Sequence, residues 1–366
     1  MHLYIHVPFC ARRCSYCDFA IAVRRNVPSV EFADAIIGEW TTWQNHVSWQ
    51  GAPTVDTIYF GGGTPSRIEP SAIARIIGRI AADRPVADGA ELTLEANPDD
   101  VTPERAAEWR AAGINRVSLG AQSFDPRVLE WMHRTHRAEQ TGPAVDALRR
   151  AGIAELSLDL IFAVPEMLDR DWAADLEAAL ALAPEHLSLY GLTVEPATPL
   201  GRWTARGDVA PAPDDRWAAD FLHADRRLRE AGYDHYEVSN AALPGRRARH
   251  NSAYWTRAPF IGLGPSAHSG FGRERRWNIR DWAAYGRAAA AGLPLMGGAE
   301  HLDDEAVRLE RVYLGLRTDA GLPDHELPRE LREAWKAAGW ATLAGGRVRL
   351  TPEGWLRLDA LVAAAA

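Results

Sequence analysis

The three cysteines of this 366-residue chain lie within eight residues, at Cys10, Cys14 and Cys17. Three cysteines cannot all pair as disulfides, and so tight a group is typical of metal binding or catalysis. Thiolates are the usual ligands of iron–sulfur clusters, and a four-iron cluster takes about four of them. A 4Fe-4S cluster held by these three thiolates would leave one iron open to a small molecule with nitrogen and oxygen donors.

Zinc is the alternative metal for the three cysteines. The sequence supplies no fourth thiolate. A closed structural zinc site would therefore need another ligand, for which His6 and His2 are the candidates. We favour the iron–sulfur cluster over zinc.

A glycine-rich segment could bind part of a ligand. Residues 61–65 read Gly-Gly-Gly-Thr-Pro after a short apolar run, and the exposed amides of such a turn can approach a ligand closely. Ordinary tight turns use glycine as well, so the segment alone is a weak indication.

Four polar side chains lie at or near the later predicted elements. Glu95 ends the third strand, Gln122 follows the fourth, Arg134 lies in the next helical segment and Asp159 lies in the fifth strand. Each of them alone could equally cap a helix or form a surface ion pair. Together, carboxylates and amides at successive strand ends suit a ligand with ribose hydroxyls, an adenine edge and a zwitterionic tail.

The elements that position these residues follow from the periodicity of apolar side chains. Six runs rich in Val, Ile, Leu, Thr and Tyr predict strands at residues 3–7, 57–60, 91–95, 116–120, 155–161 and 186–192. Helical spacing predicts helices at residues 30–43, 71–82, 103–112, 141–151 and 171–182. Alternating strands and helices predict an α/β fold with a parallel sheet and right-handed crossovers. In barrels of this kind the reactive face lies at the carboxyl ends of the strands.

Two further parts follow the barrel. Residues 211–215 resemble a linker, a helix is predicted at 216–231 and a strand within 232–239, and the glycine-rich residues 259–271 indicate a loop beside the active face or an inert turn. Helices at 303–317 and 324–338, with a hairpin around Gly345 and Gly346, predict a small α+β domain like a winged helix. We therefore expect a barrel over residues 1–210, a barrel extension over 211–300 and a winged-helix-like domain over 301–366.

The spacing Cys-x3-Cys-x2-Cys, with Tyr16 just before the last cysteine, closely resembles the cluster loop of the radical S-adenosylmethionine (SAM) superfamily. The Gly-Gly-Gly-Thr-Pro segment resembles the part of that superfamily that receives the amino group of the methionine moiety of SAM. The resemblance implies a partial (β/α)6 barrel similar to a TIM barrel. It also implies a 4Fe-4S cluster on Cys10, Cys14 and Cys17, with SAM bound at the open iron.

Three further segments narrow the resemblance: Leu-Tyr-Ile-His-Val-Pro-Phe-Cys at 3–10, Gly-Ala-Gln-Ser-Phe at 120–124 and Leu-Asp-Leu-Ile at 158–161. They are similar to the oxygen-independent coproporphyrinogen III oxidases and their relatives, the HemW-type heme chaperones, over nearly the whole chain. The resemblance places Tyr16 beside the cluster. It implies SAM contacts at Tyr4, Gly62, Gly63, Thr64, Glu95, Gln122, Arg134 and Asp159.

Two features separate the chain from the oxidases. Cys10 is only ten residues from the start, whereas the oxidases carry an N-terminal extension that helps to close their active site. Phe19 occupies the place of the additional cysteine in the oxidase pattern Cys-x3-Cys-x2-Cys-x-Cys. Both features argue against porphyrinogen decarboxylation. The alternative function is a coproporphyrinogen III oxidase, or another radical SAM enzyme that modifies a tetrapyrrole.

Residues 250–255 read His-Asn-Ser-Ala-Tyr-Trp and match the His-Asn-x-x-Tyr-Trp motif of the heme chaperones. A neutral imidazole is a good ligand for heme iron, and flat aromatic rings can cover a porphyrin face. We therefore expect His250 to bind heme, with His268 as a rival ligand. An isolated motif of this kind would more often be a buried histidine with packed aromatic neighbours. The arginines expected to pair with heme propionates are Arg246, Arg247 and Arg249.

Charge and hydropathy complete the prediction. The formal net charge of −8, and nine basic against eleven acidic residues over 301–366, disfavour nucleic-acid binding. The sequence has no apolar run near the ~20 residues of a membrane helix, and its start lacks the features of a secretory signal. We expect a cytoplasmic heme chaperone without oxidase activity, carrying the cluster and an exchangeable SAM. Its partners would be heme and an acceptor such as a membrane respiratory protein, and a homodimer is a further expectation.

Overall fold

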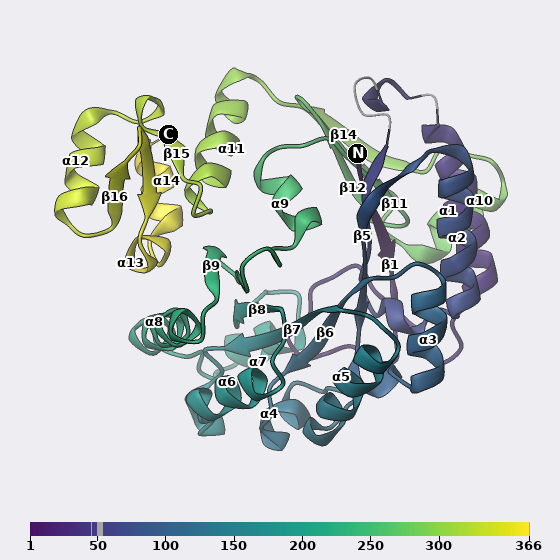
Figure 1. Cartoon of the computed structure of the whole chain (residues 1–366), viewed down its shortest axis with the longest axis horizontal. Coiled ribbons are helices and arrows are strands. Elements are labelled where there is room, and N and C mark those ends of the chain that lie inside the picture. Colours follow the sequence, from purple (N-terminus) through teal and green to yellow (C-terminus); the bar gives the residue numbers. More distant parts are fainter. Residues whose placement is uncertain (45, 50–53, 366) are drawn as a thin grey trace.

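A curved sheet forms the centre of the fold, and six parallel strands in chain order make up its middle (Figure 1). The computed structural model describes residues 1–44, 46–49 and 54–365. All six predicted strands are present and are joined through helices on the outer face, which confirms the partial (β/α)6 barrel. The strands are β1 (His2–Val7), β4 (Val55–Gly62), β5 (Val86–Ala96), β6 (Arg116–Gln122), β7 (Glu155–Phe162) and β8 (His186–Gly191).

The helices between these strands each bury an apolar face. In α2, Ile73, Ile76, Ile77 and Ile80 recur at helical spacing, and all four are buried. The five predicted helices are confirmed to within one residue at each end, and the short helix α4 was not predicted. These helices are α1 (Ser29–Trp43), α2 (Pro70–Asp83), α3 (Pro103–Ala111), α4 (Pro126–Trp131), α5 (Thr141–Arg150) and α6 (Trp172–Ala181).

The sheet extends beyond the six strands on both sides. The strand β11 (Phe260–Leu263) pairs in parallel with β1, and β12 (His268–Phe271), β13 (Glu274–Asn278) and β14 (Met296–His301) follow in antiparallel order. Beyond β8 lie β10 (Asn240–Ala242) and β9 (Asp234–Glu237). A short parallel pair, β2 (Phe9–Cys10) and β3 (Ala22–Val23), carries the start of the cysteine loop.

The expectation of a loop over residues 259–271 is wrong, because this segment contains β11 and β12. Glycine is uncommon inside strands, so the sequence gives little indication of a strand in this segment. In the structure two backbone segments approach so closely that a glycine is required between them. A Cβ atom on Gly262 would lie 2.1 Å from the carbonyl oxygen of His268. The remaining helices of this part are α7 (Pro199–Ala205), α8 (Asp214–Glu230), α9 (Arg249–Trp255) and α10 (Trp282–Ala290).

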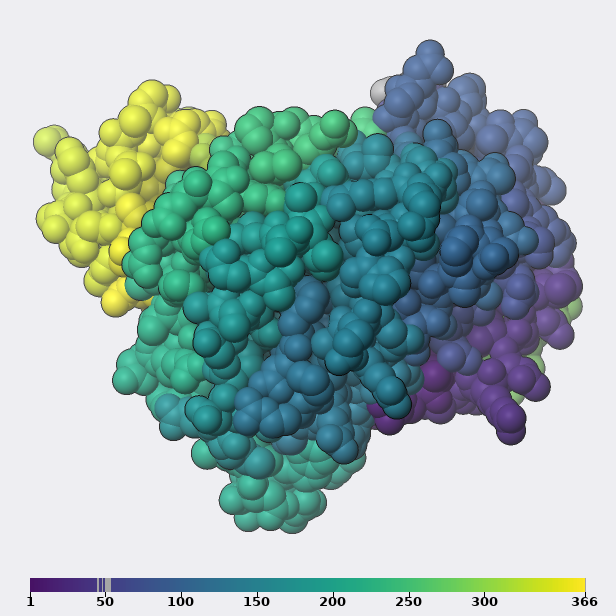
Figure 2. Space-filling model, turned by 60° about the horizontal axis from the view of Figure 1, so that its bottom comes forward, coloured from purple at the N-terminus to yellow at the C-terminus, as the bar shows by residue number. Residues whose placement is uncertain are grey.

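The C-terminal residues form a lobe at one side of the barrel (Figures 1 and 2). Its hairpin turns at Gly345 and Gly346, both with positive φ, as predicted. The predicted helix over 324–338 is wrong in its first turn, because α12 begins only after Pro328. The elements are α11 (Asp304–Leu316), β15 (Leu322–Pro323), α12 (Arg329–Ala337), β16 (Ala341–Ala344), β17 (Arg347–Leu350), α13 (Pro352–Trp355) and α14 (Leu358–Ala365).

We keep the three predicted domain ranges as a proposal. The last range ends at residue 366, which lies outside the described residues. The helix α8 begins at Asp214 and α11 at Asp304, close to the proposed boundaries. No helix in the described part of the chain is both long and apolar enough to cross a membrane.

A buried carboxylate joins the sheet extension to the barrel helices. Glu39 of α1 is 3% exposed and accepts hydrogen bonds from the Gly264 amide (2.8 Å), the Asn278 side-chain amide (2.6 Å) and the Tyr285 hydroxyl (2.6 Å). Burial raises the pKa of Glu39 from 4.5 to about 7, against the opposing effect of these hydrogen bonds. One side chain thus fixes the turn after β11, the end of β13 and the helix α10.

We expect the substitution Glu39→Gln to flatten the dependence of stability on pH. The folded chain binds the proton of Glu39 more tightly than the unfolded chain does, so this group's contribution is fully present below pH 4.5. This contribution amounts to about 3 kcal/mol, and it is lost as the pH rises through about 7. Urea unfolding between pH 5 and 8 should show the native protein losing more stability than the variant. Parallel curves would contradict this account, and Glu108→Gln, at an exposed site on α3, serves as the control.

Candidate functional site

A cavity of about 430 Å³ opens at the carboxyl ends of the barrel strands. All three cysteines line it, although they come from a loop far in sequence from most of its other residues. Two predicted residues, Tyr4 and His250, are not part of its lining. The predicted residues that do line it, besides the cysteines, are Tyr16, Gly62, Gly63, Thr64, Glu95, Gln122, Arg134 and Asp159.

Strand alternation explains how these side chains meet. Side chains at every second position of a strand face the same side of the sheet. Ser118 and Gly120 of β6 line the cavity, and so do Asp159 and Ile161 of β7. Gln122 also lines it, but after a register shift in β6 and with a φ of +64°. Because the strands are parallel, their carboxyl ends bring these positions together at one edge of the barrel.

Two donors point at the cysteine sulfurs. The Thr64 hydroxyl lies 3.5 Å from Cys10 Sγ, and Arg134 Nη1 lies 3.7 Å from Cys14 Sγ. Burial raises the pKa of the Cys10 thiol, and it raises the pKa of Cys17 to about 11. A guanidinium and a hydroxyl beside partly buried sulfurs suit thiolates whose charge is shared with iron.

The donor set fits an iron–sulfur cluster better than zinc. Cys10, Cys14 and Cys17 are the three thiols of the chain, and all of them line the cavity. A zinc ion requires its ligands around one centre, whereas the thiolates of a four-iron cluster each bind a different iron. His6, the candidate fourth zinc ligand, hydrogen bonds instead to the Tyr4 hydroxyl (3.2 Å) and the Ala20 carbonyl (2.9 Å).

Two carboxyl groups face the cavity from inside the barrel. Glu95 accepts hydrogen bonds from the Tyr59 hydroxyl (2.7 Å) and the Gly62 amide (3.0 Å), and burial raises its pKa to about 7. Asp159 accepts from the Ser118 hydroxyl (2.8 Å), and burial raises its pKa as well. Oriented acceptors of this kind suit the hydroxyl and ammonium groups of a nucleoside with an amino-acid tail.

Arg134 does not lie in a helix, contrary to the sequence expectation. It follows α4 in a loop, where its Nη2 atom donates to the Asn97 side chain (2.5 Å) and to the Gly120 carbonyl (2.9 Å). These bonds hold the guanidinium between the cysteine loop and the strand ends. Arg134 therefore connects the cysteine side of the cavity to the carboxylate side.

The ring of His250 is buried inside the barrel and does not face the cysteine cavity. Its Nδ1 atom is 2.7 Å from the Thr57 hydroxyl and its Nε2 atom is 2.8 Å from the Tyr254 hydroxyl. Burial lowers the pKa of His250 to about 3, so the ring is neutral. Because both nitrogens are bonded, this arrangement offers heme iron no ligand atom of His250, and its predicted role gains no support from the geometry.

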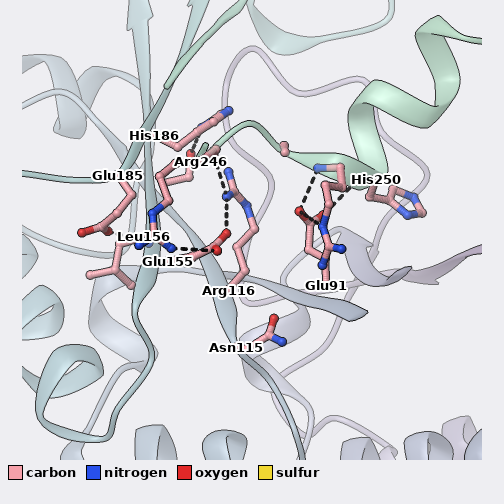
Figure 3. Close-up of polar contacts among 12 residues, drawn as sticks. Glu91, Asn115, Arg116, Glu155, Leu156, Glu185, His186, Arg246 and His250 are labelled. Carbon is pink, nitrogen blue, oxygen red and sulfur yellow. Dashed lines mark hydrogen bonds and ion pairs between the residues drawn. The ribbon is translucent and has the colours of Figure 1, made fainter. Parts of the chain in front are cut away.

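The first turn of α9 is anchored by a carboxylate from β5. Glu91 is 3% exposed and accepts hydrogen bonds from the backbone amides of Arg249 (2.8 Å) and His250 (3.0 Å), as Figure 3 shows. A carboxylate at a helix N-terminus satisfies amides that lack partners within the helix. Glu91 thereby fixes α9 across the amino-terminal half of the barrel strands.

The three arginines at the start of α9 and just before it are paired with protein groups and not left free for propionates. Arg246 contacts Glu155 at 3.1 Å (Figure 3), and Arg247 contacts Asp319 of the C-terminal lobe at 2.7 Å. Arg249 contacts Glu91 at 4.0 Å. Their expected role in binding heme therefore gains no support from the structure.

Sequence reasoning missed several cavity residues. They are Asn97, Ser118, His133 and Tyr190. Asn97 follows Glu95 by two positions, so strand alternation was a usable signal for it. A register shift in β6 separates Ser118 from Gln122, so alternation did not mark Ser118. Nothing in the sequence pattern marks His133 or Tyr190.

The fold and the cavity define a radical SAM protein. The sequence profile of the radical SAM superfamily matches residues 4–179. The structure of coproporphyrinogen III oxidase (HemN) from Escherichia coli matches with a TM-score of 0.81 at 19% identity, covering 99% of this chain and 89% of the oxidase. At that identity the match shows a shared fold.

Two curated relatives identify the family. The heme chaperone HemW of Mycobacterium tuberculosis is 37% identical, over 98% of this chain and 93% of its own length. The heme chaperone HemW of Synechocystis is 36% identical, over 93% of this chain and 83% of its own length. The chain belongs to the HemW family of the radical SAM superfamily, which confirms the resemblance found in the sequence.

The cysteine assignment predicts the effect of Cys14→Ser. A serine hydroxyl is a poor replacement for a thiolate, so we expect the variant to lose the cluster after anaerobic reconstitution. The measurement is iron and sulfide content per chain, which should fall from about four of each. Ser252→Ala, on α9 and outside the cavity, serves as the control. Full iron and sulfide content in Cys14→Ser would show that the cysteines do not hold the cluster.

The anchoring of α9 predicts a large effect of Glu91→Ala on stability. The substitution leaves two amides at the start of α9 without their acceptor, and we expect it to lower the free energy of unfolding by about 2–3 kcal/mol. Glu108→Ala, at an exposed site in α3, should change it by less than about 0.5 kcal/mol. Equal unfolding midpoints in urea for the two variants would refute the anchoring role.

Proposed function

We propose that this protein binds heme and transfers it to an acceptor protein. The observation that carries the proposal is the 37% identity, over 98% of the chain, to a relative named heme chaperone HemW. The match to the oxidase, at 19% identity, supports a shared fold and gives no support for a shared activity. In this proposal heme is the cargo, whereas the 4Fe-4S cluster and SAM are cofactors that occupy the cysteine cavity.

The residues that would hold the cofactors line the cysteine cavity. Cys10, Cys14 and Cys17 would hold a 4Fe-4S cluster. When bound, such a cluster supplies an iron site for the amino-acid end of SAM and a store for one electron. The residues that would hold SAM are Tyr16, Gly62, Gly63, Thr64, Glu95, Gln122, Arg134 and Asp159.

The protein's own groups orient a bound ligand in defined ways. Glu95, held by Tyr59 and Gly62, presents a fixed acceptor, and Arg134 keeps a positive charge against the cysteine loop. We assign no catalytic residue among them. Tyr4 packs beneath the glycine turn, where a Cβ atom on Gly61 would lie 3.0 Å from its ring, so it supports the turn from below.

Phe19 favours a chaperone over an oxidase. It lines the cysteine cavity and is 56% exposed, at the position where the oxidase pattern has an additional cysteine. A phenyl ring at the rim supplies an apolar surface and no metal ligand. We propose that the acceptor is a protein such as a membrane respiratory protein, that the transfer occurs in the cytoplasm and that the chaperone acts as a homodimer.

The test compares heme binding with porphyrinogen turnover. We expect the anaerobically reconstituted protein to bind about one heme per chain in an absorbance titration. Incubated with reductant, SAM and coproporphyrinogen III, it should form no protoporphyrinogen, because Phe19 replaces the extra cysteine. An active oxygen-independent oxidase is the positive control. Turnover without heme binding would overturn the proposal and make the chain an oxidase.

A further inference from the structure

A second cavity of about 420 Å³ adjoins the cysteine cavity. The two cavities share Asp18, Phe19 and Gly62, so the cysteine loop forms a wall of both. The other walls come from β1, α9 and the sheet extension that sequence reasoning missed. Its volume lies within the range of about 300–1,000 Å³ that is usual for cofactor and small-molecule sites.

The second cavity is lined largely by aromatic rings. Tyr254 and Phe260 pack edge to face with ring centroids 4.7 Å apart, and Tyr4 and Phe19 lie on other sides. Phe19 is one of the few exposed large apolar side chains in the described chain. Such walls suit a flat, apolar macrocycle.

His268 offers a free ligand atom in this cavity. It is exposed at the start of β12, and in the described part of the chain neither of its ring nitrogens takes part in a hydrogen bond. In contrast, both ring nitrogens of His250 are hydrogen bonded. A neutral imidazole with a free nitrogen is a suitable axial ligand for heme iron.

The turn before His268 is held rigidly. Gly264 has a φ of +97°, and a Cβ atom there would lie 2.5 Å from the His6 carbonyl oxygen, so only glycine fits. The amide of Gly264 donates to Glu39 at 2.8 Å. The histidine therefore projects from a backbone that is already ordered, as a ligand site requires.

Arg280 supplies a positive charge at the same cavity. Its guanidinium is exposed and donates to the Asp18 carbonyl at 3.3 Å, and no ion pair links it to a described carboxylate. A guanidinium with free donors can bind a carboxylate through two hydrogen bonds. It is thus better placed to meet a propionate than Arg246, Arg247 and Arg249.

We propose that heme binds in the second cavity, with His268 as the axial iron ligand and Arg280 paired with a propionate. This assignment rests on the proposed function. His133 is the rival ligand because it is exposed and lines the cysteine cavity. That cavity also presents the acidic side chains of Glu95, Asp159 and Glu195, whereas the described lining of the second cavity has Asp18 alone, which lines both. The second cavity is thus the less acidic surroundings for a propionate.

His250 then acts as a positioning residue. Its Nε2 atom holds the Tyr254 hydroxyl at 2.8 Å, and Tyr254 forms part of the wall that would cover the heme. The motif at residues 250–255 thus contributes Tyr254 to the cavity while its histidine stays inside the barrel. Loss of the His250–Tyr254 bond should weaken heme binding without removing the iron ligand.

The test is the absorbance and electron paramagnetic resonance spectrum of ferric heme bound to the full reconstituted chain. We expect His268→Ala to lose the spectrum of histidine-ligated heme and to bind heme about tenfold more weakly, or worse, and imidazole in the buffer to restore the spectrum. Tyr254→Phe, and His250→Gln if it folds, should weaken binding yet keep the spectrum. The control is His325→Ala, at an exposed site in the C-terminal lobe, which should change neither.

Two results would overturn the assignment. One is an unchanged spectrum and affinity in His268→Ala, and the other is loss of the histidine-ligated spectrum in His133→Ala in place of His268→Ala. Failure of the native chain to bind heme would instead defeat the proposed function, so the two failures are distinguishable.

The role of Arg280 has a separate test. Arg280→Ala should weaken binding of heme but leave binding of heme dimethyl ester, whose propionates carry no charge, nearly unchanged. Equal losses for both compounds would show that Arg280 does not meet a propionate.

Discussion

The buried carboxylates inside the barrel need hydrogen-bond donors there, and the rest of the structure depends on where those donors come from. Glu91 accepts the first amides of α9, which holds that helix across the amino-terminal half of the strands. Glu95 accepts from Tyr59 and Gly62, which fixes the glycine turn at the other end. Glu91 and Glu95 lie on the same strand, β5. Buried carboxylates of one strand therefore position both α9 and the glycine turn that lines the cysteine cavity.

Two cavities with different chemistry lie side by side and share Asp18, Phe19 and Gly62. The cysteine cavity combines sulfurs, carboxylates and Arg134, which suits a cluster and a polar nucleoside. The second cavity combines aromatic rings with His268 and Arg280, which suits a porphyrin. The segment at Asp18 and Phe19 borders both cavities, so the order of the cysteine loop affects the shape of the second cavity.

Much of the fold and of the cofactor site followed from sequence, because alternation of apolar residues and the cysteine spacing are local signals. The strands β11 and β12 did not, since close packing there requires Gly262 and Gly264, which obscure a strand pattern. The surroundings of His250 could not be predicted from the sequence either, because its hydrogen-bond partner Thr57 lies 193 residues earlier in the chain. That contact decides whether His250 is a buried structural histidine or a free metal ligand. The restart of α12 after Pro328 was readable, since proline disfavours helix in the residue before it.

The central claim is that cluster and heme occupy adjacent, separate cavities of one chain. Anomalous diffraction at the iron edge, from crystals of the reconstituted protein with heme, tests it most directly. The account predicts one iron peak at Cys10, Cys14 and Cys17 and a second within coordination distance of His268. A second peak beside His250 or within the cysteine cavity, or none at the cysteines, would contradict it.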